Sequence, residues 1–86
     1  MQNRLFLVRA GWDEDAGVWV ATSEDVPGLV TEAETLEQIR AKVLIMLPEL
    51  LAANAVPLIG NEILVHILAE QTARIVNSPP VFGATP

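Results

Sequence analysis

The chain has 86 residues, of which 51% are hydrophobic, and eleven acidic residues against five basic ones give a formal net charge of −6. This length fits one small domain, and so high an apolar content excludes a disordered chain. The negative charge disfavours direct binding to nucleic acids and favours a basic protein partner.

The sequence contains no cysteine, which excludes disulfide bonds, zinc–thiolate sites and cysteine nucleophiles. Arg4 and Arg9 bracket only four apolar residues near the N-terminus, so we expect no signal peptide. The uncharged run at 50–61 is too short to span a membrane and contains Pro57. We therefore expect a cytoplasmic protein that does not bind membranes.

The first part of the chain has the pattern of a β-hairpin over residues 4–23. Apolar side chains alternate along residues 4–12, and the turn residues 13–17 end in Gly17, which suits a positive φ. A second strand follows at 18–23. Pro27 and Gly28 then predict a tight corner, after which residues 29–32 have the composition of a short third strand.

Thr35 begins a predicted helix, because Thr35 and Gln38 have the spacing of a capping box. Glu34 and Glu37 lie near the positive end of the helix dipole. Apolar residues then recur at helical spacing, namely Leu36, Ile39, Val43, Met46, Leu47 and Leu50. We expect Pro48 to kink this helix or to begin a second segment, and the pattern ends at Asn54.

After a loop at 57–61, the last predicted element is a long strand over residues 62–76. Its apolar residues alternate at odd positions, and Gln71 interrupts the alternation once; a helix is the alternative interpretation. Residues 77–86 form a Pro/Gly-rich tail, which we expect to be mobile, so the single domain covers residues 1–76.

The predicted order is β-β-β-α-β, an α+β fold with a small antiparallel sheet and one main helix packed on one face. We expect the last strand to pair with the first. One helix covers one sheet face only, yet the strands carry apolar residues on both faces. We expect the uncovered face to join copies of this chain into a homodimer or higher oligomer, through Leu5, Leu7, Leu64, His66 and Leu68. The alternative is that loop 57–61 or the tail covers it.

The sequence contains no pattern that indicates catalysis or a bound cofactor. Asp13 and Asp15 lie in the predicted hairpin turn and lack the glycine and distal glutamate of a calcium loop. His66 has no second histidine or cysteine to complete a common zinc site, and Ser23 has no nucleophile elbow around it. We expect no catalytic and no metal-binding residues, and we expect the protein-partner site at Glu24, Asp25, Glu32 and Trp19.

Four short segments together resemble the N-terminal domain of HicB-like antitoxins. They are the acidic turn Asp13–Asp15, the strand Trp19-Val20-Ala21, the corner Asp25-Val26-Pro27-Gly28 and the helix start Thr35-Leu36-Glu37-Gln38. The resemblance implies a β-β-β-α-β domain related to part of the RNase H-like and double-stranded-RNA-binding folds. It also implies an oligomeric domain that blocks a small, basic, RNA-cleaving toxin.

The chain departs from that family at three places. Leu29 stands where many members have cysteine, Pro48 interrupts the helix, and residues 77–86 leave no room for the family's DNA-binding segment. We therefore expect a stand-alone relative that acts as a non-enzymatic interaction module. Two alternatives stay open: a small metal-dependent hydrolase that uses Asp13, Asp15, Glu24 or Asp25, and a structural homo-oligomer with another role.

Overall fold

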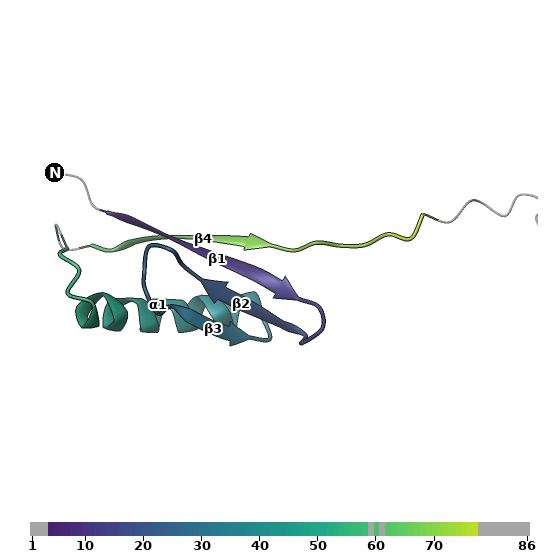
Figure 1. Ribbon diagram of the computed structural model, residues 1–86, viewed down its shortest axis with the longest axis horizontal. Helices are drawn as coiled ribbons and strands as arrows, with labels where there is room; N and C mark the ends of the chain where they lie inside the picture. Colours follow the sequence, from purple (N-terminus) through teal and green to yellow (C-terminus); the bar gives the residue numbers. More distant parts are fainter. Residues whose placement is uncertain (1–3, 59, 61, 78–86) are drawn as a thin grey trace, which may run out of the picture.

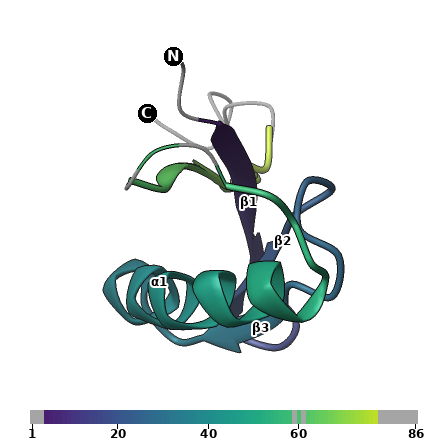
Figure 2. The same cartoon turned by 90° about the vertical axis from the view of Figure 1, so that its left-hand side faces the viewer.

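The computed structural model describes residues 4–58, 60 and 62–77. Four strands form one sheet, and a single helix packs on one of its faces (Figures 1 and 2). The elements are β1 (Leu5–Asp13), β2 (Val18–Thr22), β3 (Val30–Ala33), α1 (Leu36–Ala53) and β4 (Leu64–Glu70). The expected α+β class and the order β-β-β-α-β are confirmed.

The sheet is mixed, with the strand order β3-β2-β1-β4. Strands β1, β2 and β3 pair antiparallel, whereas β4 runs parallel to β1, from Leu5 beside Leu64 to Gly11 beside Glu70. The prediction of an entirely antiparallel sheet was therefore wrong for the last strand. The reason lies in α1, which returns the chain to the end of the sheet where β1 begins.

The β1–β2 turn uses the residues that the sequence predicted. Gly17 has a φ of +70°, and its N–H donates a hydrogen bond to the carbonyl of Asp13 at 2.8 Å. The Asp13 carboxylate accepts the N–H groups of Asp15 and Ala16 at 3.1 and 3.2 Å. Asp13 is thus explained by turn formation.

The Pro27-Gly28 corner is anchored in the core. Val26 is 0% exposed and Leu29 is 2% exposed, and the Leu29 N–H donates to the carbonyl of Val26 at 3.1 Å. Gly28 has a φ of +87°, which only glycine adopts without strain. The side-chain amide of Asn54 donates to the carbonyl of Pro27 at 3.2 Å, so the end of α1 holds the corner in place.

Helix α1 begins as predicted and passes through Pro48 without a break. The Thr35 hydroxyl accepts the Gln38 N–H at 3.1 Å, as expected for an N-cap. The helix continues across Pro48 as one element, so the expected second segment does not form. It ends in a Schellman motif, in which the N–H of Ala55 donates to Ala52 and that of Val56 donates to Leu51.

The core lies between α1 and the sheet. Its fully buried centre includes Phe6 and Val8 from β1 and four helix residues at a spacing of four, namely Ile39, Val43, Leu47 and Leu51. The helix packs against β2 and β3. Strand β4 therefore lies beyond the area that α1 covers, and its inward residues Val65 and Ile67, like Ile63 just before the strand, are only partly buried.

Strand β4 is shorter than predicted. Its pairing with β1 stops at Glu70 opposite Gly11, two residues before β1 itself ends at Asp13. Residues 71–77 continue as an exposed, extended segment instead of completing the predicted strand to residue 76. Of the predicted tail, all but Asn77 lies outside the described residues, as do 59 and 61 of the predicted loop.

Candidate interaction surface

The sheet face that points away from α1 carries a row of apolar side chains across its strands. Because strand residues alternate between faces, the buried Phe6, Val8 and Ala10 place their neighbours in β1 on the opposite side. Paired residues of neighbouring strands lie on the same face, so the pairing of β1 with β2 and β4, and of β2 with β3, identifies the residues of the other strands on this face. We call this surface the open face; it comprises Leu5, Leu7, Arg9, Val18, Val20, Thr22, Val30, Glu32, Leu64, His66, Leu68 and Glu70.

The open face exposes large aliphatic side chains. Leu5 and Leu64 lie side by side in the β1–β4 register and are 57% and 43% exposed. Leu68 is 38% exposed on the same strand, and Val30 is 66% exposed at the other edge of the sheet. Leu5 and Leu64, with Leu7 and His66 next to them in the register, form a largely apolar exposed patch, which is typical of an interface. The structure therefore brings together all five residues that the sequence predicted for the oligomer interface.

Polar residues from the β2–β3 connection border this face and satisfy the backbone of Leu7. The Asp25 carboxylate accepts the Leu7 N–H at 2.8 Å, and the Ser23 hydroxyl donates to the Leu7 carbonyl at 2.6 Å. The Ser23 oxygen also accepts the Asp25 N–H at 3.1 Å. Asp25 therefore has a structural role that sequence reasoning missed, and Ser23 shares it.

These residues enclose a small polar cavity of about 160 Å³ at the edge of the open face, lined by Leu7, Arg9, Thr22, Ser23, Glu24 and Asp25. Arg9 pairs with Glu70 at 3.1 Å, and both side chains are more than half exposed (56% and 59%). An ion pair this exposed adds little stability. The cavity thus combines a cation and two carboxylates at the surface, with the Asp25 carboxylate already engaged by the backbone.

Comparison with known proteins places the chain in a family. The sequence pattern of a family described as a domain of unknown function, DUF1902, matches residues 5–78. The chain belongs to this family. No curated protein matches the chain.

The DUF1902 domain is also similar to a solved structure, that of a hypothetical protein from the extremely thermophilic bacterium Thermus thermophilus. The two sequences are 51% identical, and the TM-score is 0.64. The match covers 85% of this chain and 99% of the other. Neither the family description nor that protein's name states an activity.

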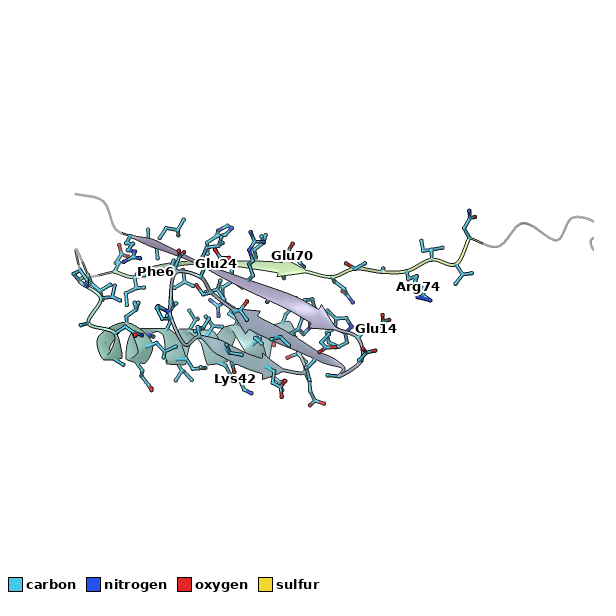
Figure 3. The ribbon with its side chains drawn as sticks, viewed as in Figure 1. Phe6, Glu14, Glu24, Lys42, Glu70 and Arg74 are labelled. Carbon is cyan, nitrogen blue, oxygen red and sulfur yellow. The ribbon has the colours of Figure 1, made fainter. Side chains whose placement is uncertain are left out.

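The acidic residues considered for a hydrolase do not form one site in this DUF1902 domain. Asp13 and Asp15 belong to the β1–β2 turn, whereas Glu24 and Asp25 follow the other end of β2. Figure 3 shows the separation, with Glu14 at the turn and Glu24 far from it. Over the described ranges 4–58, 60 and 62–77, no three histidine, aspartate or glutamate side chains lie together as a metal site would require.

The remaining predicted partner residues lie on different faces. Glu32 lies on the open face opposite Val20, whereas Trp19 lies on the helix side, where it packs against the core. Trp12 meets Trp19 edge-on, with ring centroids 5.4 Å apart, and this contact explains both aromatic residues as packing. Trp19 is therefore not brought together with Glu24, Asp25 and Glu32.

His66 is exposed on the open face, beside Leu7 and between two leucines of β4. In the part of the chain that the structure describes, no helix is long and apolar enough to cross a membrane. The open face and its acidic border are thus the main candidate for function in this DUF1902 domain.

Proposed function

We propose that this chain is a non-enzymatic protein-interaction module that assembles with copies of itself and neutralises a small, basic, RNA-cleaving protein. The observation that carries the proposal is the open face: a sheet surface with exposed leucines, bordered by carboxylates and left uncovered by the only helix of the described residues.

The apolar part of the open face supports binding to a protein. Leu5 lies beside Leu64 in the β1–β4 register, and Leu68 follows His66 on the same face of β4. Burial of apolar surface contributes about 25 cal/mol per Å² to the free energy of binding. Apolar side chains are therefore typical of the buried centre of a protein–protein interface. We assign self-association to these leucines together with Leu7 and His66.

The charges support a basic partner. The whole chain carries a formal charge of −6, and two carboxylates are exposed: Glu24 at the border of the open face and Glu32 on the face itself. Complementary charge steers association and suppresses binding to acidic partners. The same charge opposes direct contact with RNA, so the target is the RNA-cleaving protein and not its substrate.

The HicB-like segments support the choice of partner class. The corner at Pro27-Gly28 and the helix start at Thr35 have in the structure the forms that the resemblance implied. HicB antitoxins use such a domain to block a small basic ribonuclease. This part of the proposal depends on the resemblance, and the open face supplies the surface.

The test begins with the gene beside the one that encodes this chain, because the two proteins of such a pair are encoded together. The neighbouring small basic protein is purified and titrated with this chain in a calorimeter. We expect a tight complex that a Glu24→Lys/Glu32→Lys variant weakens at least tenfold.

A matched control separates position from net charge. Glu14→Lys/Glu49→Lys also replaces two exposed glutamates, at the hairpin turn and on α1, and each substitution adds two positive charges, so both variants change −6 to −2. We expect the control to retain most of the affinity. Equal losses of affinity in the two variants would show that binding depends on net charge and not on the open face. Absence of binding by the parent chain would overturn the proposal.

A further inference from the structure

The outer edge of β4 is an open template for another strand. Strand β4 lies at the end of the sheet order and pairs only with β1 within the described residues. Natural proteins protect such edges with charged residues, prolines or bulges. The β4 sequence LVHILAE has one charged residue, Glu70 at its end, and no proline. The edge therefore lacks the usual protection against strand pairing.

The segment that follows β4, residues 71–77, is here called the C-terminal arm. Figure 1 shows it continuing away from the sheet along the direction of β4, and all of its residues are exposed. Ile75 is 89% exposed and Val76 is 75% exposed. The odd-position alternation that runs through β4 continues in the arm at Ala73 and Ile75. The arm therefore has the pattern of a strand whose neighbour a single copy does not provide.

An apolar groove runs beside the same edge. It has a volume of about 150 Å³, lies between α1 and β4, and is lined by Leu44, Leu47, Pro48, Ile63 and Val65. The groove exists because α1 packs against β2 and β3 and leaves the inner face of β4 partly open. Leu44, on its helix side, is 40% exposed.

We propose that two copies of this chain pair antiparallel along their β4 edges, about a two-fold axis at Ala69, and exchange C-terminal arms. In this register Ala69 faces Ala69 of the second copy. Ala73 faces the partner's Val65, and Ile75 faces the partner's Ile63. Each Ile75 then covers the partner's groove, and each arm gains the strand neighbour that it lacks.

The register follows from side-chain direction and from charge. Two residues that face each other in an antiparallel pair point to the same side of the sheet. Ile75 therefore reaches the partner's groove only if it faces an odd-numbered residue, either in β4 or at Ile63 just before it. A two-fold axis at Glu70 would place the Glu70 carboxylates of the two copies opposite each other, which is destabilising. A two-fold axis at Leu68 would place Ile75 opposite a residue before the partner's Ile63, and Ile75 would no longer reach the groove. The axis at Ala69 avoids both.

This pairing is a second contact, separate from the open face and independent of the proposed function. Because odd residues face odd residues, both helices lie on one side of the joined sheet, and the two open faces lie next to each other on the other side. Failure of the edge contact would leave the binding of a basic protein by the open face unchanged.

Single cysteines test the register, because the chain has none of its own. Opposite residues of an antiparallel pair have Cα atoms about 4.5–5.5 Å apart, which a disulfide can span. We expect Ala69→Cys to form a covalent dimer on mild oxidation, much faster than Glu14→Cys at the hairpin turn. Faster cross-linking of Leu68→Cys than of Ala69→Cys would overturn the register, and equal rates for Ala69→Cys and Glu14→Cys would overturn the pairing.

A pair of arm variants tests the groove. Ile75→Asp and Val76→Asp place the same charge at neighbouring exposed positions, but only residue 75 points toward the partner's groove in the proposed dimer. Sedimentation measurements are made in a Leu5→Glu background, which weakens association through the open face. We expect Ile75→Asp to raise the dimer dissociation constant at least tenfold and Val76→Asp to raise it much less. Equal constants for the two variants, or a monomeric background protein at high concentration, would overturn the proposal.

Discussion

The carboxylate of Asp25 accepts the backbone N–H of Leu7 at 2.8 Å, which joins two residues 18 positions apart. Antiparallel pairing of β1 with β2 starts only at Arg9 opposite Thr22, so the first part of β1 has no strand neighbour on that side. In this part of β1, the side chains of Ser23 and Asp25 supply the hydrogen bonds that a neighbouring strand would otherwise provide. Asp25 thereby fixes the acidic border of the open face against the sheet.

Replacing Asp25 tests this role. Asp25→Ala leaves the partly buried Leu7 N–H without its acceptor, and an unsatisfied group of this kind costs about 1–3 kcal/mol. We expect urea unfolding to show a loss in that range. The control is Glu24→Ala, which removes an exposed neighbouring carboxylate and should change the stability by no more than about 0.5 kcal/mol. Similar losses in both variants would contradict the role assigned to Asp25.

Gly28→Ala tests the backbone of the Pro27-Gly28 corner. An added Cβ would lie 3.5 Å from the Leu50 side chain, an ordinary contact, so the expected cost comes from the φ of +87° alone. A left-handed backbone costs a residue with a Cβ about 1–2 kcal/mol. Gly11→Ala, in β1 with nothing within 4 Å of the new Cβ, should be neutral or stabilising. Thermal unfolding of both variants measures the difference, and equal effects would contradict it.

The end of α1 predicts a stabilising substitution. Ala55 occupies the left-handed position of the Schellman motif with a φ of +54°, where glycine is usual. Ala55→Gly should therefore raise the free energy of unfolding, by up to about 1 kcal/mol after the entropy cost of glycine. Ala53→Gly, at the last residue of the helix, should lower it by up to about 1 kcal/mol. Opposite signs for the two variants in urea unfolding are the expected result, and a loss in both would be evidence against this geometry.

Leu5→Glu tests the open face as a contact between copies. Leu5 is 57% exposed, so the fold should tolerate the charge, whereas self-association should weaken at least tenfold. Ile45→Glu is the matched control, because Ile45 is 66% exposed on α1, away from the open face. Sedimentation equilibrium compares the two variants. A larger effect of Ile45→Glu would place the contact on the helix instead.

Much of the fold could be predicted because the signals are local. Gly17 in the hairpin turn, the Pro27-Gly28 corner and the Thr35 cap each act within four residues of themselves, and all three form as expected. The two faces of the sheet were also predictable, because side-chain alternation does not depend on the neighbouring strand.

The direction of β4 was predicted wrongly because alternation is the same in parallel and antiparallel strands. A signal was available in the length of α1: its 18 residues rise by roughly 27 Å, which returns the chain to the end of the sheet where β1 starts. The early end of β4 depends on its pairing with β1, which stops at Gly11, and the role of Asp25 depends on the β1–β2 register. Neither can be derived from the local sequence alone.

The most direct test of the central proposal is a titration of RNA cleavage. The small basic protein encoded beside this chain is assayed on a labelled RNA, and purified full-length chain is added in increasing amounts. We predict that cleavage falls to zero at a fixed molar ratio and that Glu24→Lys/Glu32→Lys shifts the titration to much higher concentrations. Cleavage that continues unchanged in the presence of excess chain would contradict the proposal.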